Sequence, residues 1–162
     1  MLAAHGIEAI ADVRRFPGSR RHPHFGRDAL TASLALAGIE YHGFPDLGGR
    51  RTPRSDSHNT AWRNAAFRGY ADYMETADFD TAIRRLESIA ARRRTAVLCA
   101  EALWWQCHRA LISDYLKARG VDVLHIGDAK HAPLHPFTKA AQIIEGRLSY
   151  GASQLALTPP NR

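Results

Sequence analysis

The side chains best suited to chemistry lie close together in one short stretch of the chain. Cys99 and Glu101 follow an apolar run, and the amphipathic segment that comes next opens with Cys107, His108 and Arg109. A thiol at the N-terminus of a helix is favoured as the thiolate and can act as a nucleophile. A buried thiol away from charge is instead an inert packing residue. The sequence leaves both interpretations of the two cysteines open.

The spacing of these residues does not predict a metal centre. The two thiols are eight residues apart and lack the short C-x₂₋₄-C spacing of zinc sites. Neighbouring residues of a helix also point about 100° apart, so Cys107 and His108 are not expected to bind one metal ion together. The C-x-x-C redox motif is absent as well. We expect no metal ligands and no Cys99–Cys107 disulfide, and the sequence identifies no cofactor.

Two carboxylates are candidates for acid–base chemistry. Asp12 and Glu101 each stand at the end of an expected strand. If those strands are neighbours, the carboxylates meet across one cleft, where such a pair can have two different pKa values and work as acid and base. Asp12 and Glu101 are therefore candidate catalytic residues, assisted by His108. The alternative is that Asp12 pairs with Arg14 and only orients the loop.

The charge of the chain favours an anionic partner. The net charge is +6 and the sequence pI is about 9.8, which suits a phosphorylated metabolite, a nucleotide or a nucleic acid. Arginines interleaved with aromatic residues are typical of surfaces that bind phosphates and stack bases. The alternative is a solvated loop whose aromatic residues pack inward. The candidate substrate-binding residues are Arg14, Arg15, Arg51, Arg54, Trp62, Tyr70, Tyr73 and Arg109.

The elements that must position these side chains alternate along the chain. Hydrophobic periodicity predicts strands at 7–13, 39–44, 95–100 and 121–126, and helices at 27–37, 70–76, 79–92 and 108–119. This alternation indicates an α/β fold with a mostly parallel sheet flanked by helices, a Rossmann-like three-layer sandwich. Ligands usually bind where parallel strands end. We therefore expect one cleft at that edge, covered by the long loop 45–67 and lined by Asp12, Arg14, Glu101, His108 and Arg109.

Length and composition indicate one soluble domain. The 162 residues suffice for a single α/β domain over 1–150, followed by a flexible tail at 151–162. No apolar stretch approaches the roughly 20 residues that span a bilayer, and the N-terminal residues do not form a secretory signal. We expect a cytoplasmic protein that does not associate with membranes. The sequence leaves the oligomeric state open.

Several stretches resemble a known bacterial family, domain of unknown function 488. They are Ala11-Asp-Val-Arg-Arg-Phe-Pro17, Leu47-Gly-Gly-Arg-Arg51, Trp62-Arg-Asn, Phe67-Arg-Gly-Tyr-Ala-Asp-Tyr-Met74, and Cys99-Ala-Glu101 with Cys107-His-Arg109. The resemblance implies a fold and a set of site positions, but no reaction. It also implies an N-terminal strand that ends in a Thr-Ile-Gly-His-Ser-like motif and is followed by a helix. We expect this chain to begin near the end of that helix, without the strand.

The sequence is compatible with three functions. The favoured one is an enzyme that acts by acid–base chemistry on a substrate that bears phosphate or derives from a nucleotide or nucleic acid. In it, Arg14, Arg15 and Arg109 bind charge. The first alternative is a nucleotide- or nucleic-acid-binding module without chemistry. The second is a thiol-based sensor or hydrolase centred on Cys99 and Cys107.

Overall fold

A computed structural model describes residues 1–18 and 21–152 of the chain. Its centre is a three-stranded parallel sheet in the order β2-β1-β3. The strands are β1 (Ala9–Asp12), β2 (Glu40–Gly43) and β3 (Thr95–Leu98). In register, Asp12 lies opposite Gly43 on one side and Leu98 on the other. The three strands therefore end level with one another, as expected for a ligand-binding edge.

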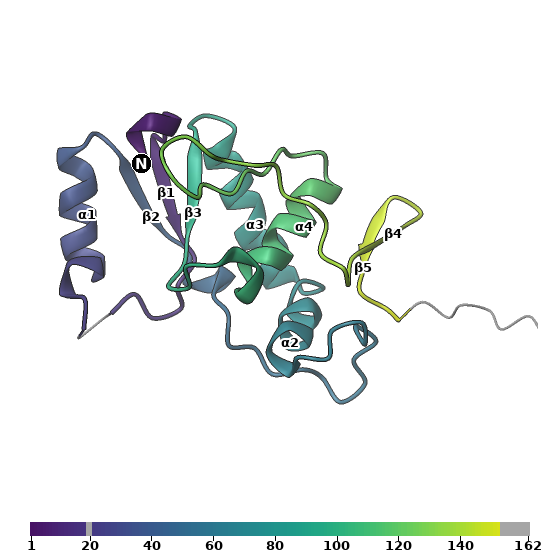
Figure 1. Cartoon of the computed structure of the whole chain (residues 1–162). Helices are drawn as coiled ribbons and strands as arrows, with labels where there is room; N and C mark the ends of the chain where they lie inside the picture. The colour runs from purple at the N-terminus through teal and green to yellow at the C-terminus, as the bar shows by residue number, and fades with distance from the viewer. Residues whose placement is uncertain (19–20, 153–162) are drawn as a thin grey trace, which may run out of the picture.

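The described residues form four α-helices. They are α1 (Arg27–Leu36), α2 (Ala65–Tyr73), α3 (Ala77–Ala90) and α4 (Arg109–Ala118). Helix α1 lies on one side of the sheet and α3 and α4 on the other, while α2 packs against α4 (Figure 1). Capping residues explain where α3 and α4 lie along the chain. The Thr76 hydroxyl accepts a hydrogen bond from the Phe79 backbone N–H at the start of α3, and Gly120, at φ 81°, follows the end of α4.

The two faces of the sheet are buried against different helices (Figure 1). Ala9, Ala11 and Val13 pack into the main core with residues of α3 and α4. Ile7 and Ile10 belong to a second, smaller cluster with Leu34 and other residues of the α1 side. Because successive strand residues point to opposite faces, β1 divides its side chains between these two clusters.

The observed fold confirms most of the predicted elements. The parallel α/β sheet with flanking helices is as expected, whereas the Rossmann-like three-layer sandwich stays a prediction. The predicted helix at 70–76 is wrong in its bounds, since α2 begins at Ala65 and ends at Tyr73. Asn64 caps α2 by accepting from the backbone N–H groups of Ala66 and Phe67, which moves the start of the helix into the expected loop.

The predicted fourth strand at 121–126 is wrong. Among the residues that the structure describes, that segment makes one isolated antiparallel bridge, from Leu124 to Leu134, and joins neither sheet. Leu124 is 45 % exposed, so its apolar run does not form a buried strand. The C-terminal part instead forms an antiparallel pair that periodicity did not indicate, β4 (Gln142–Ile144) with β5 (Arg147–Ser149). Of the expected tail at 151–162, residues 153–162 lie outside the described part of the chain.

Candidate functional site

The predicted site residues gather at the edge where the strands end, but on opposite faces of the sheet. Asp12 points with Ile10 toward the α1 side, where it contacts Tyr41. Val13 points to the other face, and its carbonyl lies 3.3 Å from the Nε2 atom of His108. The single cleft expected for Asp12 and His108 is therefore wrong, because adjacent strand residues face opposite ways.

The Asp12 carboxylate is fully engaged by its neighbours. It accepts hydrogen bonds from the Arg14 backbone N–H at 3.1 Å and from the Arg14 Nε at 2.8 Å. The Arg14 Nη2 and the Tyr41 hydroxyl donate to its other oxygen at 2.5 and 2.7 Å. Burial alone would raise the pKa of Asp12, but these hydrogen bonds outweigh it and lower the pKa. Asp12 thus orients Arg14, as in the alternative interpretation above.

The two thiols and His108 form a compact group on the opposite face. Cys99 directly follows β3, and Cys107 ends the short 3₁₀ turn η4 (Trp104–Gln106). The Cys107 Sγ lies 3.1 Å from the Cys99 Sγ and 3.5 Å from the His108 Nδ1. Both cysteines are free, as predicted. We call these three residues the dithiol–histidine cluster.

The geometric argument against shared metal ligation by Cys107 and His108 is wrong. Cys107 is not helical: its φ of −130° and ψ of 153° are extended, and His108 is the first residue to adopt the helical region. The two side chains therefore do not diverge by one helical step, and they meet beside Cys99. One ligand atom from each of the three residues lies within 4.8 Å of the other two.

Three contacts fix the ring of His108. Its Nε2 is within hydrogen-bond distance of the Val13 carbonyl, and its ring centroid lies 5.0 Å from that of Tyr70. A Cβ placed on Gly49 would lie 2.8 Å from the His108 Nδ1, so only glycine allows this approach of the loop. The predicted covering loop thus meets the cluster through Gly49.

The environment shifts the pKa values of the two thiols in opposite directions. A hydrogen bond from the Cys107 thiol, opposed by burial and helped by His108, lowers the pKa of Cys99 well below its ordinary value. The same hydrogen bond, together with burial, raises the pKa of Cys107. The cluster therefore favours a thiolate on Cys99 and a protonated thiol on Cys107.

Most of the predicted substrate-binding residues have structural partners. Arg51 donates to the carbonyls of Gly48 and Asp46 and stacks on Tyr73, and Arg54 pairs with Glu75. Tyr70 and Tyr73 donate their hydroxyls to the carbonyls of Leu47 and Asp46. Trp62 packs against Phe67 and Tyr150. These contacts support the packing interpretation of the loop.

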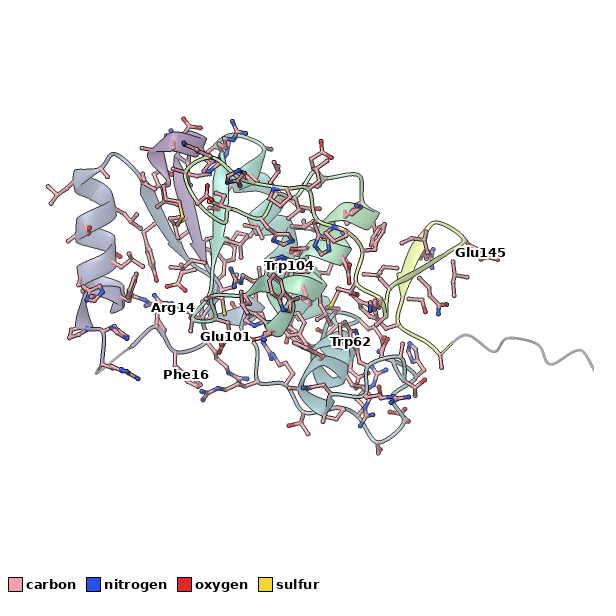
Figure 2. The ribbon with its side chains drawn as sticks, viewed as in Figure 1. Arg14, Phe16, Trp62, Glu101, Trp104 and Glu145 are labelled. Carbon is pink, nitrogen blue, oxygen red and sulfur yellow. The ribbon has the colours of Figure 1, made fainter. Side chains whose placement is uncertain are left out.

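Arg109, Glu101 and Arg15 lie nearer to solvent around the cluster. Arg109 donates to the backbone carbonyls of Glu101 and Ala102, and so holds the loop between the two cysteines. Glu101 itself is exposed. The exposed Arg15 reaches the carbonyl of Arg50. Figure 2 shows Arg14 and Glu101 at the end of the sheet where the strands finish.

Sequence reasoning missed Gly49 and a buried network around Asp114. The Asp114 carboxylate accepts hydrogen bonds from His135 at 3.0 Å, from the Thr138 hydroxyl at 2.6 Å and from the Tyr150 hydroxyl at 2.9 Å. His135 contacts His125, whose ring stacks on Trp104. The signal was Asp114 itself, an acid among the apolar residues of α4. The signal for Gly49 was the stretch Leu47-Gly-Gly-Arg-Arg51, which resembles the family.

The fold and the cluster define an α/β protein with two thiols and an imidazole at the carboxyl edge of a parallel sheet. The chain belongs to the family described as domain of unknown function DUF488, whose model matches residues 1–116. No curated protein and no solved structure matches the chain. Within the described residues, every helix is too short or too polar to cross a membrane.

Proposed function

We propose that this protein is a thiol-based redox protein in which Cys99 and Cys107 alternate between a dithiol and a disulfide. The observation that carries this proposal is the 3.1 Å contact between the two sulfurs. A shift of about 1 Å would bring them to bonding distance. Cys99 is partly exposed, whereas Cys107 is only 3 % exposed. Cys99 is accordingly the attacking sulfur, and Cys107 is the one that resolves the intermediate.

The proposed substrate class is a low-molecular-mass disulfide. The Cys99 thiolate attacks one substrate sulfur, the substrate S–S bond breaks, and one substrate thiolate leaves. Cys107 then loses its proton and attacks the Cys99 sulfur, which releases the second substrate thiolate. The substrate gains two electrons and becomes two thiols, and the protein loses two electrons and gains one disulfide. The His108 Nδ1, 3.5 Å from the Cys107 Sγ, is placed to accept the Cys107 proton.

An anionic substrate fits the charge around the cluster. The exposed Arg15 and Arg50 flank Gly48 and Gly49, and Gly49 contacts His108. Together with the net charge of +6, they would attract a disulfide that carries carboxylates or phosphates. A reducing compartment such as the cytoplasm would return the disulfide to the dithiol. The proposal therefore includes an anionic disulfide as the partner and the cytoplasm as the location of the protein.

The acid–base and binding-module hypotheses have less support. Asp12 is held by Arg14 and Tyr41 on the face away from His108. A groove of about 810 Å³ lies on the Asp12 side, near Tyr41. It is lined by two arginines, Arg27 and Arg85, and also by Asp28 and Asp46, so its charges balance. That balance does not favour a polyanion.

A redox titration with alkylation and mass spectrometry tests the proposal. The reduced wild-type chain, equilibrated with mixtures of reduced and oxidised glutathione, should lose both thiols together and gain one internal disulfide. Cys107→Ser should instead accumulate a mixed disulfide with glutathione at Cys99. Cys99→Ser should form little mixed disulfide, because Cys107 is buried. Two thiols that stay free and independent in the folded wild type, under oxidising glutathione, would overturn the proposal.

A further inference from the structure

We propose that the reduced protein binds one Zn²⁺ ion through Cys99, Cys107 and His108, with the fourth coordination position open. The three ligand atoms come from the end of β3 and the start of α4, and they lie within 4.8 Å of one another. Two thiolates and one imidazole are a donor set that suits zinc. The site is independent of whether the dithiol turns over, since it needs only the reduced form.

Two of the three distances between ligand atoms are close to those of a tetrahedral centre. With Zn–S near 2.3 Å and Zn–N near 2.0–2.1 Å, tetrahedral angles place sulfur and nitrogen about 3.6 Å apart and two sulfurs about 3.8 Å apart. The Cys107 Sγ–His108 Nδ1 distance of 3.5 Å already fits. The two sulfurs, at 3.1 Å, must separate by about 0.7 Å. The loop between the cysteines is mostly exposed and can accommodate this shift.

The surroundings of His108 resemble those of a metal-bound histidine. When Nε2 carries the proton and donates it to the Val13 carbonyl, 3.3 Å away, the Nδ1 lone pair points toward the sulfurs. Metal-binding histidines usually donate their other ring N–H to a carbonyl or carboxylate, which fixes the tautomer and the ring orientation. Gly49 and Tyr70 hold the ring on its other sides. The imidazole is therefore pre-oriented for ligation.

Three protein ligands leave room for a further one. Among the residues the structure describes, the group of potential metal ligands at this position consists of Cys99, Cys107 and His108. Zinc sites with three protein ligands generally hold water or a substrate in the fourth position. Because both sulfurs would be bound to the metal, zinc binding and the Cys99–Cys107 disulfide exclude each other. Oxidation of the pair would release the ion.

Cobalt spectroscopy on the full reduced chain tests the site, because Co²⁺ can stand in for Zn²⁺ and absorbs visible light. We expect one Co²⁺ per chain, tetrahedral d–d bands, a thiolate-to-cobalt charge-transfer band, and loss of both signals on adding one equivalent of Zn²⁺. Losing a hydrogen-bond partner of a ligand typically costs about 10–100-fold in affinity, so losing a ligand should cost at least as much. Cys107→Ser and His108→Gln should each show that loss.

His131→Gln is the matched control. His131 is exposed, pairs with Asp128 and lies outside the cluster, so its replacement should leave the cobalt spectrum and the affinity unchanged. Folded, reduced wild type without a charge-transfer band would overturn the proposal, whatever the variants do. Equal affinity in His108→Gln and His131→Gln would overturn it too. Wild type that forms the internal disulfide in the glutathione titration but binds no Co²⁺ would refute the zinc site alone, and wild type that binds Co²⁺ but forms no disulfide would refute the redox function alone.

Discussion

Replacing Gly49 by alanine should destabilise the protein through His108. The new Cβ would lie 2.8 Å from the His108 Nδ1 and 3.3 Å from its Cε1, whereas ordinary contacts begin at 3.4 Å. The ring must therefore move by about 0.6 Å. Its bond to the Val13 carbonyl, already 3.3 Å long, then breaks. Overpacking of this kind costs about 1–3 kcal/mol of unfolding free energy.

Urea denaturation of the reduced chain measures this cost. Alanine in place of glycine also restricts the unfolded chain, which stabilises a protein by about 0.4–1 kcal/mol. Gly18→Ala shares that effect and is the matched control, because a Cβ at Gly18 meets nothing within 4 Å and its φ is not positive. The difference between the two variants isolates the contact with His108. Equal unfolding free energies would refute the reasoning about the ring.

Three further changes test other parts of the structure. Asp114→Ala should cost about 1–3 kcal/mol or more in urea denaturation, because it leaves buried donors such as the Tyr150 hydroxyl without their acceptor; a loss below 1 kcal/mol would contradict the network. Tyr70→Phe should cost about 1–3 kcal/mol by the same measurement, since the buried Leu47 carbonyl loses its donor, and an unchanged midpoint would argue against that bond. The folded pKa of Asp12 is lowered from 3.8, so its stabilising effect is present above that value and disappears as pH falls through the folded pKa. The stability gap between wild type and Asp12→Asn should therefore shrink below about pH 4, and a gap that is constant with pH would contradict this assignment.

Local sequence determined the elements that are both periodic and capped. The apolar stripe of α3 and the acidic residues of its first turn determined where the helix lies in the sequence. The helix begins directly after Thr76, whose side chain caps it. The run that ends at Leu98 and the stripe of α4 located the strand and the helix that flank the two cysteines. These signals lie within about one helical turn or one strand, so they can be recognised without the fold.

Elements without such local signals were decided by tertiary packing. In the described part of the chain, the apolar run at 121–126 forms a single bridge to Leu134 instead of extending the parallel sheet. The start of α2 depends on the Asn64 cap within a segment of weak periodicity. Whether an apolar segment forms a strand depends on partner strands elsewhere in the chain, so a short stretch of sequence does not determine it.

The arrangement of the candidate site was likewise determined in part by the sequence and in part by the tertiary structure. The sequence placed Cys99, Cys107 and His108 at one strand–helix junction because they are neighbours along the chain. Only the tertiary structure turned Asp12 away from them, since one residue along β1 reverses the face of the sheet. Only the tertiary structure brought Gly49 against His108, because their contact joins a loop to a helix far along the chain. Distances between side chains from distant segments depend on how the backbone folds, and a linear sequence does not contain them.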